Sequence, residues 1–299
     1  MKKIRSSICF LLNPAAGRKD PQLLYRSIQK EAEARWATFE VVTIQPRDSV
    51  ADLAKRKSGQ FDIVVACGGD GTVNSVVNGL AETDAILGVL PIGTGNDFAK
   101  AIQVNFSLLQ CFDILESKKA IPLDLIRYSG DAEGWCANTL GIGLDGLANY
   151  YSKSYKWLTG PIVYVIGAIR AAWNFRGSFV ELTVDDKTIK QTMVMMTACN
   201  GKWEGGKFYL APEADLKDGL INFITIGKIS FLRILFYLPF FRWGPKKWMK
   251  ELKSELVRNI EVKSAQPVAV HADGEHIGSD IKSLNVKIVS GVLKVITGY

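Results

Sequence analysis

The chain has 299 residues, of which 47% are hydrophobic, and a formal net charge of +7. A chain of this length can bury enough apolar surface for one large domain or two ordinary ones. Its five cysteines are scattered and odd in number, and they include no CxxC pair. This pattern argues against a disulfide framework or a cysteine zinc site and favours a reducing compartment.

Two segments resemble a signal peptide or a transmembrane span, but both are too short. The apolar run Ile8–Leu12 is shorter than the core of a signal peptide and ends at Asn13-Pro14. Between Lys156 and Arg170 lie 13 uncharged residues, fewer than the roughly 20 needed to cross a bilayer. We therefore expect neither a signal peptide nor a transmembrane span.

The first 125 residues alternate between short apolar runs and amphipathic segments. Strands are expected at Ile8–Leu12, Phe39–Ile44, Ile63–Ala66 and Ile86–Leu90, with helices at about Gln22–Arg35, Val50–Lys57 and Val73–Leu80. Such alternation predicts a doubly wound, mostly parallel sheet with helices on both faces. Ligands bind such sheets beyond the carboxyl ends of the strands. Three loops fall there: NPAAG (13–17), GGDGT (68–72) and GTGND (93–97).

The second part of the chain predicts a mainly antiparallel β-sandwich. Its short alternating runs are Val180–Val184, Thr192–Ala198, Leu220–Ile226, Leu256–Val262, Val268–Ala272, Leu284–Val289 and Leu293–Ile296. Helical patterns interrupt them at Leu158–Trp173 and Phe231–Lys253. We expect an N-terminal domain over 1–125 and a β-rich domain over 126–289, with 290–299 able to return to the first.

The loop GGDGT combines features of an anion site with a negative charge. Its glycines let backbone N–H groups approach a phosphate, and the helix after them offers its positive end. Thr72 could add a hydroxyl and cap that helix. Asp70, however, would repel phosphate by roughly 3 kcal/mol per unit charge at ~5 Å and an effective dielectric near 20. A divalent cation reverses this sign, so the loop suits a Mg²⁺–nucleotide site. A plain turn is the alternative.

Two further aspartates strengthen the metal hypothesis. Asp97 ends the second glycine loop, and Asp124 lies among apolar residues, where an uncompensated charge is costly. Other phosphate motifs are absent or weak: no Gly-Lys pair is followed by Ser or Thr, and GIGLDG (141–146) has no acidic residue about 20 positions later. We interpret GIGLDG as a tight turn between a strand and a helix.

Taken in order, the motifs resemble those of the bacterial diacylglycerol kinase-like lipid kinases, which are related to sphingosine kinases. They are NPAAG (13–17), GGDGTVN (68–74), PIGTGNDFAK (91–100), EADLKDGLI (213–221) and ADGEHIG (272–278). NAD kinases and phosphofructokinases share GGDGT alone. Two departures stand out. Ala16 replaces a serine of the family's first loop, and Ser75 stands where glutamate is common.

The resemblance implies an NAD kinase-like nucleotide domain, ATP as co-substrate and Mg²⁺. Residues implied to hold ATP are Asn13, Pro14, Ala15, Ala16, Gly17, Thr43, Gly68, Gly69, Asp70, Gly71, Thr72, Val73, Asn74 and Thr94. Asp70, Asp97 and Asp124 would form a carboxylate–water–Mg²⁺ network in which Asp70 is also catalytic. A separate structural Mg²⁺ would be held by Asp218 with main-chain oxygens of Asp215 and Leu220. Glu275 would be the general base.

Without the resemblance, VAVHADGEHIG (268–278) reads as a β-hairpin. Asp-Gly between alternating segments is a strong turn signal, and Glu275 would begin the return strand. A tight turn can also present a catalytic carboxylate rigidly, so the two interpretations are compatible. The chain has only two histidines, His271 and His276. Because they have no metal-ligand spacing, we favour packing or surface roles for both.

The segment 228–258 carries eight Lys/Arg and two Glu, most of the chain's excess charge. Phe, Tyr and Trp interleave with these cations, which fits an anionic membrane surface better than nucleic acid. The apolar residues could equally be core. The expected protein is a cytoplasmic ATP:lipid kinase that contacts the inner face of the membrane, with diacylglycerol as first acceptor and phosphatidylglycerol, a sphingoid base or undecaprenol as others. An exposed sheet edge could support a homodimer. A kinase of a soluble acceptor and a non-enzymatic, nucleotide-gated lipid carrier are the alternatives.

Overall fold

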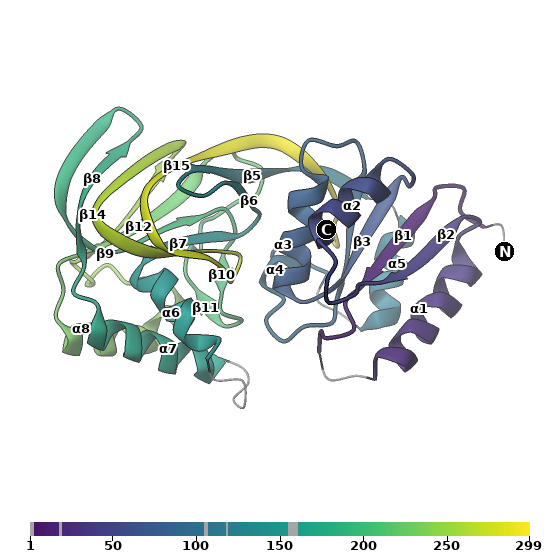
Figure 1. Ribbon diagram of the computed structural model, residues 1–299, viewed down its shortest axis with the longest axis horizontal. Helices are drawn as coiled ribbons and strands as arrows, with labels where there is room; N and C mark the ends of the chain where they lie inside the picture. Colours follow the sequence, from purple (N-terminus) through teal and green to yellow (C-terminus); the bar gives the residue numbers. More distant parts are fainter. Residues whose placement is uncertain (1–2, 18–19, 105–106, 118, 155–160) are drawn as a thin grey trace. The chain divides into compact units, whose positions relative to one another are not determined.

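The computed structural model describes residues 3–17, 20–104, 107–117, 119–154 and 161–299 (Figure 1). The chain forms two compact units, one of Met1–Leu123 with Gly291–Tyr299 and one of Asp124–Ser290. The long strands β5 (Ala120–Gly130) and β15 (Glu275–Ile296) carry the chain from one unit to the other. None of the described helices is long and apolar enough to span a bilayer.

The first unit is built on a parallel sheet, as the alternating pattern predicts. In spatial order its strands are β2 (Phe39–Thr43), β1 (Ile8–Leu12), β3 (Ile63–Gly68), β4 (Ile86–Pro91) and the end of β15. Every residue of β1 and β3 is buried, as expected of a parallel sheet that is covered on both faces. The helices flank it on both sides (Figure 1). They are α1 (Pro21–Arg35), α2 (Val50–Ser58), α3 (Asp70–Leu80), α4 (Asp97–Ala101) and α5 (Leu108–Ser117).

The core of this unit is packed tightly enough to fix the strand ends. The rings of Phe10, Trp36 and Phe112 meet at centroid distances of 5.6–6.2 Å, joining the sheet to α5 and to the end of α1. On the other face a Cβ on Gly79 would lie 2.2 Å from the Ala51 carbonyl oxygen, so α2 and α3 touch through a glycine. Burial on this scale keeps the loops beyond the strand ends in place.

The second unit is an antiparallel β-structure with helices. In spatial order its main strands are β13 (Leu252–Val257), β12 (Ile221–Gly227), β9 (Lys187–Cys199), β7 (Thr139–Gly143), β14 (Asn259–Ala272) and β15. Strand β8 (Ser178–Val184) pairs with β9 and β14, β6 (Gly134–Cys136) pairs with β5, and β10 (Trp203–Glu204) pairs with β11 (Phe208–Tyr209). The helices are α6 (Leu144–Ser152), α7 (Pro161–Asn174), α8 (Phe231–Tyr237) and the 3₁₀ helix η1 (Leu238–Trp243).

Two expected elements differ from the structure. The helix expected over 231–253 stops being α-helical at Tyr237, continues as η1, and gives way to β13 from Leu252. Pro239 cannot supply a helical N–H, and Gly244 adopts a φ of 82°, so the regular helix cannot continue. The strand expected over 256–262 is interrupted at Arg258. There Asp185 Oδ1 accepts the N–H groups of Arg258 and Asn259, which separates β13 from β14.

The expected helix 158–173 begins in residues outside the described part of the chain; from Pro161 onward it is α7. The GIGLDG segment is the tight turn that the sequence predicts. Strand β7 ends at Gly143, whose φ of 82° favours glycine, and α6 begins at the next residue.

Candidate active site and a buried polar cluster

The three glycine loops of the first unit interlock beyond the ends of β1, β3 and β4. A Cβ on Gly93 would lie 2.4 Å from Gly69 Cα, so these two loops touch backbone to backbone. Gly17 has a φ of 75°, and a Cβ there would lie 2.4 Å from the Ile92 carbonyl oxygen. The first loop thus packs on the third. Only glycine permits these approaches, which explains why all three loops are glycine-rich.

Hydrogen bonds join the first two loops as well. Asn13 Nδ2 donates to Thr72 Oγ1 at 2.9 Å, and the Asn13 N–H donates to the Cys67 carbonyl. The expectation that Thr72 caps the following helix is wrong. Helix α3 begins at Asp70 after Gly69, without a side-chain cap, and Thr72 lies buried inside its first turn. An α3 amino terminus that no side chain caps suits an anion.

Asp70 organises the backbone of the GTGND loop. Its Oδ2 accepts the Asn96 N–H at 2.8 Å and its Oδ1 accepts the Asp97 N–H at 2.7 Å. Asn96 is left-handed (φ 53°), and the buried Asp97 pairs with Lys100 at 3.0 Å. A Cβ on Gly95 would lie 2.5 Å from Asp70 Oδ2 and 4.0 Å from Asp97 Oδ2. The two carboxylates therefore border a common space that a glycine keeps open.

The other predicted nucleotide residues lie on these loops or on the elements next to them. Thr43 is the last residue of β2, while Val73 and Asn74 belong to the first turns of α3. Thr94 is exposed in the third loop. Ala15 donates its N–H to Asn13 Oδ1, so the NPAAG loop is closed on its own asparagine. At Ser75, where the family commonly has glutamate, the hydroxyl donates to the Gly71 carbonyl.

Asp124 lies in the second unit, on the turn of Asp215 to Leu220. Its Oδ2 accepts the Gly219 N–H at 2.7 Å, and its own N–H donates to the Leu216 carbonyl. Burial, together with the nearby carboxylates of Asp215 and Asp124, raises the pKa of Asp218. The turn thus brings three carboxylates together and carries excess negative charge. A hard cation, which prefers oxygen ligands, would offset this charge.

The hairpin that carries Glu275 is held by a buried carboxylate. Asp273 and Gly274 form its turn with φ values of 50° and 79°, and Ala272 pairs with Glu275 across it. Asp273 accepts the backbone N–H groups of Ala137, Asn138 and Thr139 at 2.7–3.1 Å. The predicted hairpin and the start of the return strand at Glu275 are confirmed. The turn is thereby anchored to the segment between β6 and β7.

Helix α6 lies along this hairpin and contacts it at three places. Asp145, Asn149 and Lys153 are spaced four residues apart, which places them on one face of the helix. Asp145 approaches His271, Asn149 Nδ2 donates to the Gly274 carbonyl at 2.8 Å, and Lys153 Nζ lies 2.6 Å from Glu275 Oε2. The side chains of Lys153 and Glu275 are about half exposed. The candidate base is thus presented to solvent from a backbone that is fixed beneath it.

Beneath the hairpin lies a buried cluster of Asp145, Glu204 and His271. The imidazole is completely buried, with Nε2 3.0 Å from Glu204 Oε1 and 3.5 Å from Asp145 Oδ1. Burial and the charge of Asp145 raise the pKa of Glu204 to about 8. Burial alone would lower the pKa of His271, but Asp145 and Glu204 outweigh it and raise that pKa to about 10. His271 in turn outweighs the effect of burial on Asp145 and lowers its pKa.

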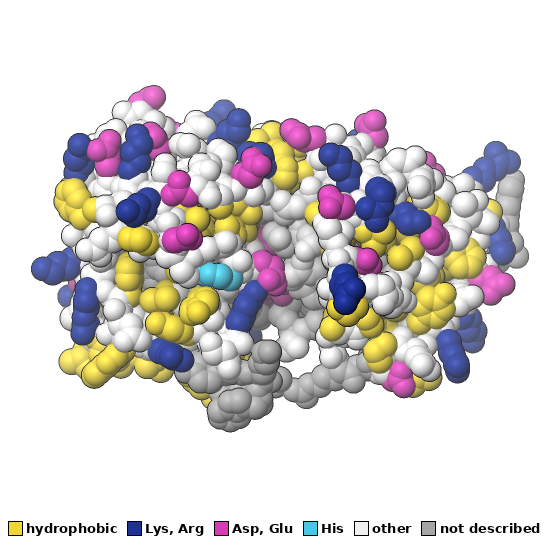
Figure 2. All heavy atoms as spheres, in the orientation of Figure 1, with side chains coloured by type: hydrophobic (Ala, Val, Ile, Leu, Met, Phe, Trp, Pro, Cys, Tyr) yellow, Lys and Arg dark blue, Asp and Glu magenta, His cyan; other side chains and the backbone are white. Residues whose placement is uncertain are grey.

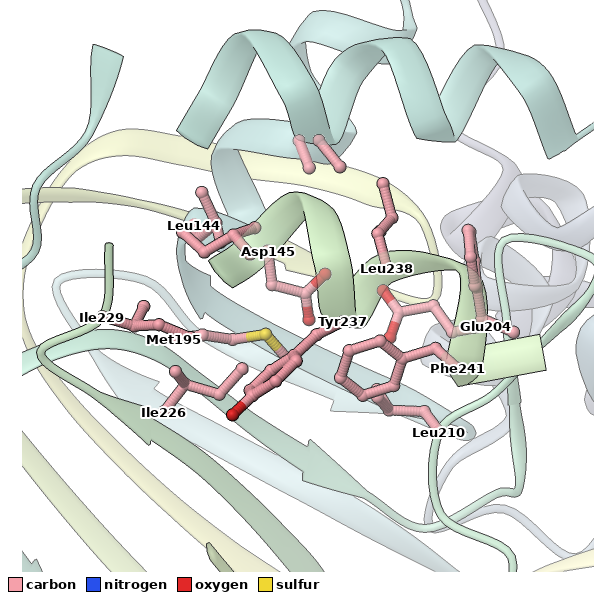
Figure 3. Close-up of a pocket in the computed structure, with 14 residues that line it drawn as sticks. Leu144, Asp145, Met195, Glu204, Leu210, Ile226, Ile229, Tyr237, Leu238 and Phe241 are labelled. Carbon is pink, nitrogen blue, oxygen red and sulfur yellow. The ribbon is translucent and has the colours of Figure 1, made fainter. Parts of the chain in front are cut away.

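An apolar pocket in the second unit ends at this cluster (Figure 3). Its cavity volume is about 100 Å³, and its described lining is apolar or aromatic apart from Asp145 and Glu204. Helix α6, strands β9 and β12, and the segment from Ile229 to Phe241 supply the walls. A long apolar chain with a polar end would match this distribution of side chains.

Comparison with known proteins assigns both halves of the chain. Residues 7–128 match the family model of the diacylglycerol kinase catalytic domain, and residues 138–297 match that of the YegS C-terminal NAD kinase beta sandwich-like domain. The chain belongs to the diacylglycerol kinase-like family of lipid kinases. Lipid kinases of this family are phosphotransferases with an alcohol group as acceptor, and the resemblance inferred from the motifs is confirmed.

Relatives of this lipid kinase cover most of its length. A diacylglycerol kinase of Bacillus subtilis is 26% identical, over 93% of this chain and 91% of its own. A protein of Xanthomonas campestris named "Probable lipid kinase YegS-like" is 29% identical, over 78% of this chain and 79% of its own. Two solved structures share the fold. A diacylglycerol kinase from Bacillus anthracis has a TM-score of 0.77 at 18% identity, covering 99% of this chain and 98% of its own. An ATP-bound NAD kinase from Archaeoglobus fulgidus has a TM-score of 0.55 at 14% identity, covering 97% and 93%. The predicted fold class is confirmed.

Within this lipid kinase, the segment 228–253 has some residues in the protein interior and others at the surface. Tyr237 and Phe241 are buried and line the apolar pocket, whereas Leu232, Phe236 and Trp243 are more than half exposed. Figure 2 shows hydrophobic and basic side chains close together at the lower left, where Figure 1 places α8. The exposed members of this surface, here called the basic aromatic patch, are Leu232, Phe236, Arg242, Trp243, Lys247, Trp248 and Lys250.

The sequence reasoning missed the buried cluster. His271 was expected to pack or lie at the surface, and no role was seen for Glu204. The two acidic ligand candidates are 59 residues apart in sequence, and His271 is 67 residues beyond Glu204, so no local spacing could reveal them. The one available signal was the Asp145 of GIGLDG, an acidic residue between apolar neighbours directly after a glycine turn.

Proposed function

We propose that this lipid kinase transfers the γ-phosphoryl group of ATP to a lipid hydroxyl, with diacylglycerol as the acceptor and phosphatidic acid as the product. The observation that carries the proposal is the apolar pocket of the second unit. Asp145 lines it and also stands two helical turns before Lys153, the partner of Glu275. At 1.5 Å per residue, that separation along α6 is about 12 Å. An apolar chain in the pocket could therefore leave its hydroxyl end near Glu275.

The proposed nucleotide domain is 1–125 with 290–299, and the proposed lipid domain is 126–289. The glycine loops would hold the phosphates through backbone N–H groups and the amino terminus of α3. Asp70 would act through the backbone of Asn96 and Asp97, because both of its oxygens accept their N–H groups. Glu275 would accept the proton of the attacking hydroxyl, while Lys153 holds its carboxylate in place.

Magnesium fits two places on these residues. The space bordered by Asp70 and Asp97, which Gly95 keeps open, suits an ion held through water on the nucleotide phosphates. The turn with Asp124, Asp215 and Asp218 suits a structural ion, because burial and the carboxylates of Asp215 and Asp124 together raise the pKa of Asp218. When bound to the nucleotide, Mg²⁺ would neutralise the negative charge that develops on the transferred phosphoryl group.

The test is transfer of label from γ-labelled ATP to lipids in mixed micelles: diacylglycerol, phosphatidylglycerol, ceramide, a sphingoid base and undecaprenol. We expect diacylglycerol to be labelled, and Glu275→Gln to lower kcat by about 10²–10⁴-fold with ATP binding unchanged. Glu261→Gln is the matched control, since Glu261 is also a strand glutamate in an exposed ion pair. If Glu275→Gln stays as fast as the control, Glu275 is not the base.

The panel also separates the other acceptors. Labelling of a different lipid would keep the kinase and change its substrate. Transfer only to a soluble alcohol, insensitive to detergent, would favour the NAD kinase-like alternative. Binding of both ATP and lipid without any transfer would favour a carrier.

The basic aromatic patch supports a second part of the proposal, contact with the inner face of the membrane from the cytoplasm. Aromatic rings settle at the headgroup level, and cations beside them favour anionic lipid. The patch belongs to the same segment that lines the pocket. Such contact would bring the pocket close to its substrate.

A further inference from the structure

The buried cluster brings three ligand atoms together from three separate elements. Asp145 comes from α6, Glu204 from β10 and His271 from β14, and one donor atom of each lies within 4.8 Å of the others. His271 Nε2 is 3.0 Å from Glu204 Oε1 and 3.5 Å from Asp145 Oδ1. Ligands bound about 2.0–2.2 Å from one zinc ion in tetrahedral geometry stand roughly 3.3–3.6 Å apart. The two distances from His271 Nε2 are close to this range.

The imidazole of His271 is the observation that points to a ligand. Its side chain is fully buried, and Nε2 is in an ion pair with Glu204 Oε1 at 3.0 Å that lacks the geometry of a regular hydrogen bond. Buried nitrogen atoms are almost always satisfied. Here the nitrogen faces two carboxylates at once, so three groups that can each ligate a metal converge on one point.

Neighbouring residues keep this space open and orient one ligand. A Cβ on Gly141 would lie 2.3 Å from both Asp145 Oδ2 and His271 Nε2, so the first glycine of GIGLDG makes room for the cluster. Thr197 donates to Asp145 Oδ2 at 2.6 Å, which leaves Oδ1 toward the histidine. Outer hydrogen bonds of this kind orient the ligands of metal sites.

We propose that Asp145, Glu204 and His271 bind one divalent transition-metal ion of the zinc class. An imidazole nitrogen among the ligands favours zinc, cobalt or manganese over magnesium and calcium, which prefer all-oxygen sites. Three protein ligands leave a fourth position open. Because Asp145 and Glu204 line the apolar pocket, that position faces it and takes water or an oxygen at the polar end of an amphiphile. The site is independent of the proposed kinase function.

Metal binding at His271 would also affect the turn that precedes Glu275. The Gly274 N–H donates to His271 Nδ1 at 3.4 Å, so Nδ1 acts as the acceptor of a hydrogen bond. A neutral imidazole bound to metal through Nε2 carries its proton on Nδ1, so this contact must give way. The amide of Gly274 therefore changes its environment when the ion binds.

The test titrates untagged, full-length, chelator-treated protein with Zn²⁺ by calorimetry, and with Co²⁺ by visible absorption, in the absence of nucleotide and Mg²⁺. We expect one ion per chain. His271→Gln and Glu204→Gln should each weaken binding by at least about tenfold. The matched control is His276→Gln, because the chain has only two histidines. It should bind the ion like the wild type.

A second measurement needs no substitution of a proposed ligand. In wild-type protein with ¹⁵N-labelled histidine rings, Zn²⁺ should shift the ring nitrogens of one histidine, and the spectrum of His276→Gln shows which one that is. Absence of binding at millimolar Zn²⁺, a shift of His276 alone, or full binding by both His271→Gln and Glu204→Gln would overturn the site. Failure of lipid phosphorylation with Mg²⁺–ATP would leave it untouched.

Discussion

At the scale of single residues, Asp273 fixes the candidate base from below. It is buried, and its carboxylate satisfies three backbone N–H groups of 137–139. In Asp273→Asn one oxygen becomes an NH₂ group, which would leave at least one buried N–H without an acceptor. We expect the free energy of unfolding to fall by about 1–3 kcal/mol, measured by urea denaturation. Asp186→Asn, on an exposed turn, should change it by less than about 0.5 kcal/mol. Equal stability of the two variants would contradict this role.

A second residue-scale prediction concerns the glycine loops. Gly93→Ala would place a methyl group 2.4 Å from Gly69 Cα, whereas a methyl group on Gly227 would meet nothing within 4 Å. Because the nearest atom is backbone and Asn96 Oδ1 also lies 2.9 Å away, the loops must separate, at a cost of about 1–3 kcal/mol. We expect ATP affinity, measured by calorimetry, to fall about tenfold or more in Gly93→Ala and to be unchanged in Gly227→Ala. Unaltered affinity in both would remove the loop contact from the nucleotide site.

At the scale of elements, α6 acts as the support of the Glu275 hairpin. Asn149 is buried and donates to the Gly274 carbonyl. Asn149→Ala removes this bond, so we expect the turn to loosen, kcat to fall about tenfold, and the KM for ATP to stay the same. Asn174→Ala on α7 is the matched control, since its side chain donates to a carbonyl of its own helix and is exposed. A change in the KM for ATP without a change in kcat would place Asn149 in nucleotide binding instead.

The sequence predicts elements well where one pattern dominates. The strand Ile8–Leu12 agrees with β1 residue for residue, because its burial on both faces leaves an unbroken apolar run. Helices α4 and α5 and the long strand β5 were missed. So were the short strands β6, β10 and β11, which are two or three residues long and defined only by their partners. The helix expected over 231–253 failed at Pro239 and Gly244, where local backbone chemistry outweighs an apolar pattern.

In the candidate site, too, the sequence predicts some features and cannot predict others. Loops that follow parallel strands were predicted to contain ligand residues, and the structure interlocks them through Gly69 and Gly93. The sequence could not predict that both carboxylate oxygens of Asp70 accept backbone N–H groups of residues 96 and 97. Nor could it predict that Asp124 accepts a hydrogen bond from the 215–220 turn. Such partners depend on tertiary contacts between residues that are 26 to 95 positions apart.

At the scale of the whole molecule, the positive charge is concentrated beside exposed aromatic rings. Arg242, Lys247 and Lys250 are exposed members of the basic aromatic patch, and a cation near an anionic membrane contributes about 1 kcal/mol. Changing all three to Gln should weaken binding to phosphatidylglycerol-containing vesicles about a hundredfold at low salt, measured by sedimentation. Changing the exposed and scattered Lys30, Lys55 and Lys287 removes the same charge. That control should lose much less, because its cations do not face the membrane together. Wild-type binding should also weaken as salt rises. Equal losses in the two triple variants would mean that net charge, rather than this patch, directs the kinase to lipid.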